Sequence, residues 1–169
     1  AYTAVDLAET NEGRAAAWAA NATAVANLAR ISTTHGITLV HVSSDYVFDG
    51  ARIGAYTETD PVAPLGVYGQ TKAAGDAIAA TSPRHYIIRT SWVIGDGKNF
   101  VRTMASLAER GIAPDVVDDQ TGRLTFTTDI ARGIRHLVET DAPFGTYNLT
   151  GGRGPATWGG DAREGGRQT

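Results

Sequence analysis

Residues 38–46 read Thr-Leu-Val-His-Val-Ser-Ser-Asp-Tyr, an apolar and β-branched run that ends in hydroxyl side chains. A run of this kind is typical of a strand buried on both faces of a parallel sheet. Residues 12–31 are rich in Ala, Leu and Arg and predict a long helix before this strand, ended by a turn at Gly36. A second helix and a second strand are predicted at 67–80 and 86–90. This alternation predicts an α/β fold with a mostly parallel sheet.

The remaining segments continue the alternation. Gly and Pro residues throughout 49–66 predict a long loop between the first strand and the second helix. Asn99 suits the N-cap of a helix that runs to Arg110, with Gly111 as its C-cap. Beyond it we expect a short strand at 114–117, a helix from Thr128 to Glu139 and a strand at 146–150.

The pentapeptide Tyr68-Gly69-Gln70-Thr71-Lys72 gives the second helix a chemical signature. Its spacing places the phenol and the ammonium on one helical face, a turn apart. With a hydroxyl at the end of the preceding strand, the set suits carbonyl reduction. The hydroxyl would hold the substrate oxygen and the phenol would give it a proton, while the ammonium would lower the pKa of the phenol and bind a ribose hydroxyl. The alternative is an ordinary surface Tyr and Lys on an amphipathic helix.

Composition limits the classes of function. The formal net charge of −3 gives no electrostatic footprint for nucleic acid or an anionic membrane. No apolar stretch is long enough to span a bilayer. Without cysteine the chain has no disulfide or thiolate chemistry, and we expect a cytoplasmic protein. The four histidines are scattered without metal-ligand spacing, so we expect no metal site.

Eight segments of the chain carry a resemblance to one group of proteins. Together they resemble the extended short-chain dehydrogenases/reductases, and among these the dTDP-4-dehydrorhamnose reductase family. The segments that carry the resemblance are 1–6 (AYTAVD), 21–23 (NAT), 43–50 (SSDYVFDG), 67–72 (VYGQTK), 89–93 (RTSWV), 99–101 (NFV), 119–122 (DQTG) and 157–158 (TW).

The resemblance implies a reaction and a site. It implies a Rossmann-like, doubly wound sheet and the reduction of dTDP-4-dehydro-L-rhamnose to dTDP-L-rhamnose with NADPH or NADH. Tyr68 would be the proton donor, Lys72 its electrostatic partner and ribose contact, and Ser44 the residue that holds the C4 carbonyl oxygen. Asp45 and Trp92 would contact the nucleotide-sugar substrate, although Asp45 would also suit a helix cap or a loop ion pair. The segment against the cofactor would be Ala1, Tyr2 and Thr3.

The chain departs from the family pattern in two places. It has no G-x-G-x-x-G run to cradle a dinucleotide pyrophosphate. It also begins at Ala1, within what reads as a strand-to-helix turn, so we expect a fragment that is inactive alone. Residues 1–158 would form a partial Rossmann-like reductase domain with substrate-binding elements in its C-terminal part, and 159–169 a poorly ordered, Gly- and Arg-rich tail. The strand at 38–42 would then have an exposed edge, through which we expect self-association or a homodimer.

Two other functions remain open from the sequence. One is a related nucleotide-sugar dehydratase or epimerase, but dehydratases of this superfamily carry Asp-Glu where this chain has Asp45-Tyr46. The other is a non-catalytic, reductase-like regulatory binding subunit. The hydroxyl, phenol and ammonium at Ser44, Tyr68 and Lys72 argue against that reading.

Overall fold

The computed structural model describes residues 1–97, 99–112, 120–152, 154 and 156–157. These residues form two compact units. The first unit comprises Ala1–Thr90 with Leu137–Asn148, and the second comprises Ser91–His136 with the described part of Leu149–Thr169.

A three-stranded parallel sheet forms the centre of the first unit. Its strands are β1 (Leu39–Ser44), β2 (His85–Thr90) and β6 (Gly145–Asn148), in the order β1-β2-β6. The register pairs Ser44 with Thr90, so two hydroxyl residues end neighbouring strands at the same carboxyl edge. Ligands of open α/β sheets bind outside this edge. Among the described residues β1 pairs only with β2 and so lies at one side of this sheet.

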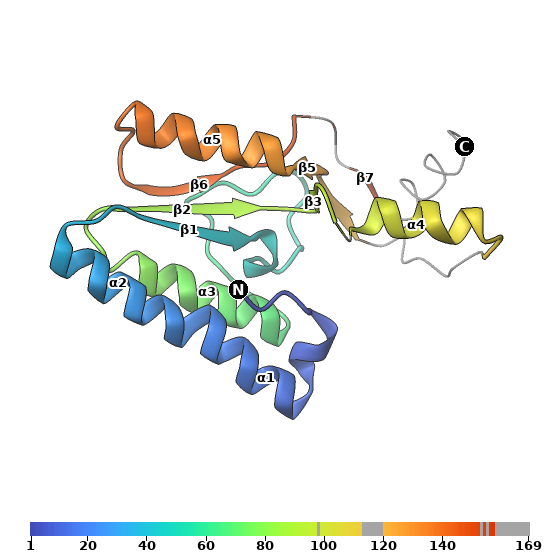
Figure 1. Cartoon of the computed structure of the whole chain (residues 1–169), viewed down its shortest axis with the longest axis horizontal. Coiled ribbons are helices and arrows are strands. Elements are labelled where there is room, and N and C mark those ends of the chain that lie inside the picture. The colour runs from blue at the N-terminus through green and yellow to red at the C-terminus, as the bar shows by residue number, and fades with distance from the viewer. Residues whose placement is uncertain (98, 113–119, 153, 155, 158–169) are drawn as a thin grey trace. The chain divides into compact units, whose positions relative to one another are not determined.

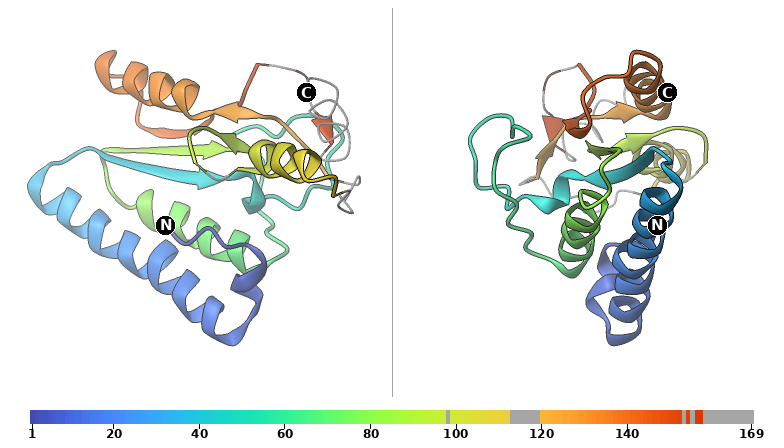
Figure 2. Two further views of the ribbon diagram at one scale, coloured as in Figure 1. Left: turned by 45° about the vertical axis from the view of Figure 1, so that its right-hand side comes forward. Right: turned by 90° about the vertical axis from the view of Figure 1, so that its left-hand side faces the viewer.

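The helices of the first unit lie together on one face of this sheet (Figure 1). One long helical segment comprises α1 (Asn11–Trp18), a π-helical turn (Ala19–Thr23) and α2 (Ala24–His35). It ends at Gly36, which adopts the left-handed conformation expected of a C-cap. The helix after the loop, α3 (Val67–Ala79), runs beside it, and Figure 2 shows the pair from two further directions. These elements confirm the predicted helices, loop and strands of residues 11–90.

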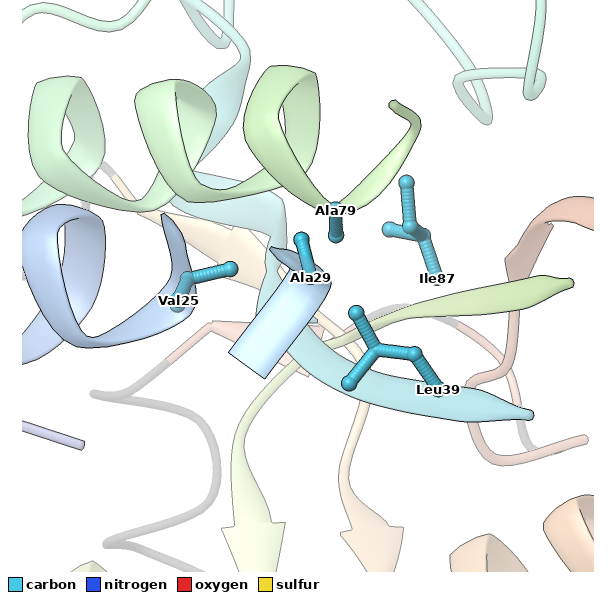
Figure 3. Close-up of a cluster of buried hydrophobic side chains, with 5 residues drawn as sticks. All are labelled: Val25, Ala29, Leu39, Ala79 and Ile87. Carbon is cyan, nitrogen blue, oxygen red and sulfur yellow. The ribbon is translucent and has the colours of Figure 1, made fainter. Parts of the chain in front are cut away.

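A small apolar core joins these helices to the sheet. Val25 and Ala29 of α2, Leu39 of β1, Ala79 of α3 and Ile87 of β2 form one buried cluster (Figure 3). Fully burying a large aliphatic side chain contributes roughly 1.5–3 kcal/mol. The cluster therefore fixes α3 against β1 and β2, and with it the helix that carries the Tyr–Lys pair.

Two glycines let α3 approach its neighbours closely. A Cβ on Gly75 would overlap the carbonyl oxygen of Asn21 in the π-helical turn, and one on Gly69 would overlap the carbonyl oxygen of Tyr46. Tyr46 lies in a short 3-10 turn, Asp45–Val47, directly after β1. The backbone of α3 thus touches both the long helical segment and the end of β1.

The second unit contains short strands and two amphipathic helices. The strands β3 (Val93–Ile94) and β5 (Thr125–Phe126) pair in parallel, and β4 (Thr121–Gly122) and β7 (Ala156–Thr157) pair antiparallel. Helix α4 (Phe100–Glu109) begins at the predicted N-cap, where the Asn99 side chain accepts a hydrogen bond from the Arg102 amide. Helix α5 (Thr127–Glu139) starts one residue before the predicted cap. The four short strands were not predicted, because a two-residue strand has no period to detect.

Two expectations lie outside the described residues: the strand at 114–117 and the tail at 159–169. Within the described part of the chain, no helix combines the length and the apolar character that crossing a membrane requires.

We expect Gly75→Ala to lower the free energy of unfolding by about 1–3 kcal/mol, because the added methyl group must push α3 away from Asn21. Alanine in an ordinary helix interior would instead add roughly 0.5–1 kcal/mol. Urea unfolding measures the difference. Ala77→Gly, on the exposed side of the same helix, calibrates helix propensity without a packing change. A stabilised Gly75→Ala variant would contradict the close packing of α3.

Candidate active site

Ser44 stands at the point where β1 turns into the 3-10 turn. Its side chain is almost wholly buried, and its hydroxyl oxygen accepts a hydrogen bond from the Tyr46 amide (3.2 Å) while donating one to Asp45 Oδ1 (3.1 Å). Ser43 points to the opposite face, because side chains alternate along a strand. Ser44, not Asp45, is therefore the residue that caps the turn.

A carboxylate from the N-terminal segment fixes the start of α3. The N-cap residue, Gly66, has no side chain to offer, and Glu9 Oε1 accepts a hydrogen bond from the Val67 amide at 2.7 Å instead. A negative charge at a helix N-terminus is favourable. This contact joins residues far apart in the sequence and sets the first turn of α3, from which Tyr68 projects.

Tyr68 is half-buried beside Ser44 and the 3-10 turn. Burial raises the pKa of its phenol, a hydrogen bond with the Ser44 hydroxyl opposes the rise, and the charge of Asp45 adds to it. The expectation of a lowered pKa was therefore wrong for this structure, because loss of water outweighs the other effects. A raised pKa keeps the phenol protonated at neutral pH, which is the state that a proton donor needs.

Lys72 is 3% exposed, and its ammonium donates a hydrogen bond of 2.6 Å to the Val42 carbonyl oxygen of β1. Burial lowers the pKa of Lys72, and the Asp76 carboxylate opposes that effect. The alternative that Lys72 is an ordinary surface lysine is thus excluded. The structure brings together Ser44, Tyr68 and Lys72 within the first unit, at the carboxyl end of β1.

Two further side chains, Tyr46 and Asp45, lie beside this set, and the sequence did not predict their contacts with it. The ring of Tyr46 meets that of Tyr68 edge to face, with 5.6 Å between the ring centroids. Asp45 beside it is mostly removed from water, and burial raises its pKa to about 6. A carboxyl group with a pKa near neutrality changes charge in the range where many enzymes work.

Asn21 ties the N-terminal residues to α3. Its side-chain oxygen accepts a hydrogen bond from the Tyr2 amide (2.9 Å), and its side-chain nitrogen donates to the Tyr2 carbonyl (3.0 Å) and the Thr71 hydroxyl (3.1 Å). The side chain is 1% exposed and lies in the π-helical turn. Single π-helical turns occur frequently at functional sites. Ala1 and Thr3, on either side of the held Tyr2, remain exposed.

Trp92 belongs to the second unit. Its backbone has a φ of 39°, an uncommon conformation for a bulky residue, and its carbonyl oxygen accepts a hydrogen bond from the Thr125 amide (3.1 Å). The indole lies so close to Gly122 that a Cβ there would overlap the ring. This unit also contains a pocket of about 350 Å³ at the start of α4, whose lining includes Asp96, Asn99 and Arg102 and none of the predicted site residues.

Known proteins resemble this chain over most of its length. Residues 1–165 match the model of the RmlD substrate binding domain. A dTDP-4-dehydrorhamnose reductase of Mycobacterium tuberculosis is 47% identical over 146 residues, which cover 82% of this chain and 47% of the relative. A solved dTDP-4-dehydrorhamnose reductase of Clostridium acetobutylicum superposes with a TM-score of 0.92 at 39% identity, over 99% of this chain and 59% of that one. A Bacillus anthracis reductase solved in complex with NADP gives a TM-score of 0.91 at 36% identity, again over 99% and 59%.

The parallel sheet and its helices thus have the Rossmann-like α/β fold that the sequence predicted. The chain belongs to the RmlD substrate binding domain family. It spans about half the length of the curated relatives that it matches.

We expect Asp45→Asn to change how stability depends on pH. Since the pKa of Asp45 is raised from 3.8 to about 6, ionisation is harder in the folded chain, and the stabilising contribution of the protonated form is lost as pH rises from about 4 through about 6. The asparagine variant has no such loss. Its stability relative to wild type should increase by roughly 1–2 kcal/mol between pH 4 and pH 7, as measured by urea unfolding. Glu12→Gln, at an exposed carboxylate, is the control, and parallel pH curves for wild type and Asp45→Asn would disprove the claim.

Proposed function

We propose that this chain carries the catalytic half of an NAD(P)H-dependent reductase that converts dTDP-4-dehydro-L-rhamnose to dTDP-L-rhamnose. The observation that carries the proposal is the meeting of Ser44, Tyr68 and the buried Lys72 at the carboxyl end of β1. Three groups of these types fit one task, the transfer of a proton to a carbonyl oxygen that is being reduced.

Each residue then has a distinct role. On substrate binding the Ser44 hydroxyl, which has a single proton, turns from Asp45 Oδ1 and donates its hydrogen bond to the C4 carbonyl oxygen of the sugar. As the carbonyl carbon gains a hydride, its oxygen takes the proton of the Tyr68 phenol, and the product is the 4-hydroxy sugar. The positive charge of Lys72 stabilises the phenolate that Tyr68 becomes. Proton return from solvent restores the phenol.

The residues that are present fit the nicotinamide end of the proposed cofactor. A bound NADPH or NADH supplies the hydride. Lys72 has an ammonium fixed on Val42, which leaves further N–H donors for a ribose hydroxyl, and the Tyr68 phenol oxygen can accept a hydrogen bond from the same ribose. Ala1, Tyr2 and Thr3, anchored through Asn21, are the backbone segment that we assign to the cofactor. The sequence holds no glycine-rich turn for the pyrophosphate.

Asp45 and Trp92 are the side chains that we assign to the deoxysugar. Asp45 stands next to the Ser44 hydroxyl and accepts its hydrogen bond, so it borders the carbonyl position. Trp92 offers an aromatic face for apolar C–H groups and one N–H donor. We also propose that residues 1–158 make up a partial reductase domain with its substrate-binding elements toward the C-terminus.

The edge-to-face contact of Tyr46 with Tyr68 supports reduction over dehydration. A dehydratase of this type needs a second carboxylate directly after Asp45. Here that position holds an aromatic ring, which packs against the proton donor and cannot accept a proton from carbon at neutral pH.

Tyr68→Phe, made in the protein that contains this chain, should lower the rate of NADPH oxidation with dTDP-4-dehydro-L-rhamnose by a factor of about 10²–10⁴. The fold should survive, since the ring remains. Tyr147→Phe is the matched control, because it removes a phenol hydroxyl elsewhere in the first unit. Near-normal turnover by Tyr68→Phe would refute the assignment. Release of water from the sugar would indicate a dehydratase. Cofactor binding without any turnover would indicate a regulatory subunit.

A further inference from the structure

Three charged or titratable side chains meet beneath the candidate site. Asp76 of α3 lies between Arg89 of β2 and His41 of β1, and these residues are 4%, 8% and 9% exposed. Arg89 Nε donates a hydrogen bond of 3.0 Å to Asp76 Oδ2, and His41 Nε2 lies 3.4 Å from Asp76 Oδ1. The Arg89 guanidinium also stacks over the Phe48 ring, 5.2 Å from its centroid. Removing such charges from water is costly unless each one is paired.

Asp76 stands one helical turn after Lys72, at i+4, so both side chains project from the same buried face of α3. Their charges therefore attract each other where little water screens them. The buried charges around Asp76 are therefore two cations, Lys72 and Arg89, and one carboxylate, that of Asp76 itself. Without that carboxylate the two cations would lie buried against neutral groups.

We propose that Asp76 is a positioning residue that keeps the Lys72 ammonium charged and seated on the Val42 carbonyl, while Arg89 fixes the orientation of the Asp76 carboxylate. The use of Lys72 in catalysis rests on the proposed function, but the charge of Lys72 can be measured without turnover. Asp76 touches neither substrate nor cofactor in this assignment. It acts through Lys72.

The other groups around Lys72 do not replace Asp76. On the same helix Tyr68 precedes it by one turn and is a neutral phenol at neutral pH. From β1, Lys72 contacts the uncharged Val42 carbonyl, while His41 faces Asp76. From β2 the nearby charged group is the cation Arg89. The 3-10 turn contributes Asp45 and Tyr46, whose charges act on Tyr68. The π-helical turn contributes Asn21, which is uncharged.

The competing explanation is that Asp76 and Arg89 form an ion pair that only stabilises the fold. That explanation predicts a loss of stability in Asp76 variants with no change in the titration of Lys72. The two explanations are separable because Lys72 and Lys98 are the only lysines of the sequence. In a Lys98→Arg background, lysine labelled with ¹³C at Cε gives one NMR signal, which reports the charge of Lys72 directly.

The experiment is an NMR pH titration of that signal in the 169-residue chain. We expect Asp76→Asn to move the Lys72 midpoint to lower pH by about 1–3 units, because a nearby opposite charge shifts a pKa by roughly that much and Asp76 favours the charged form of Lys72. Asp76→Glu keeps the carboxylate and should leave the midpoint near that of wild type. Arg89→Gln removes the competing cation and should move the midpoint to higher pH.

A folded Asp76→Asn variant with the wild-type midpoint would overturn the proposal. If that variant does not fold, the double variant Asp76→Asn/Arg89→Gln, which removes the ion pair as a whole, is compared with Arg89→Gln: a lower Lys72 midpoint in the double variant supports the role of Asp76, and equal midpoints refute it. Since no outcome depends on enzyme activity, failure here is distinct from failure of the proposed reaction.

Discussion

The burial of one ammonium group constrains the whole candidate site. Lys72 is nearly inaccessible to water, so its charge must be balanced by protein groups. The Val42 carbonyl supplies the hydrogen bond and Asp76 the opposite charge. Both partners are available only because α3 lies directly on β1, with its side chains at 72 and 76 facing the sheet.

That close approach depends on residues with small side chains and on contacts between distant parts of the chain. Gly69 and Gly75 let the helix backbone meet Tyr46 and Asn21. Glu9 fixes the first turn of α3, and Asn21 holds Thr71 in its middle. The N-terminal segment is therefore part of the site's framework, because it supplies Glu9 and, through Tyr2, a second connection to Asn21. Each contact limits the freedom of Tyr68, whose phenol must meet Ser44.

The long helices and strands of the first unit could be predicted from the sequence. The strand before Ser44, the helix from Val67 and the pair Tyr68 and Lys72 follow from local pattern, and local pattern is what a sequence displays. The pKa of Tyr68 was predicted in the wrong direction, since burial depends on tertiary packing. The Asp76–Arg89 pair and the Glu9 cap were missed for the same reason: their partners are 13 and 58 residues apart in the chain. The short strands of the second unit carried no detectable period.

The proposal on which the site depends is that Ser44 and Tyr68 both hydrogen-bond one carbonyl oxygen at the carboxyl end of β1. Its most direct test is a crystal structure of the protein that contains this chain, with NADP⁺ and dTDP-L-rhamnose bound. We predict that the O4 atom of the sugar lies within hydrogen-bond distance of both Ser44 Oγ and the Tyr68 phenol oxygen, roughly 2.6–3.2 Å from each. A sugar bound with O4 out of reach of both hydroxyl groups would contradict the account.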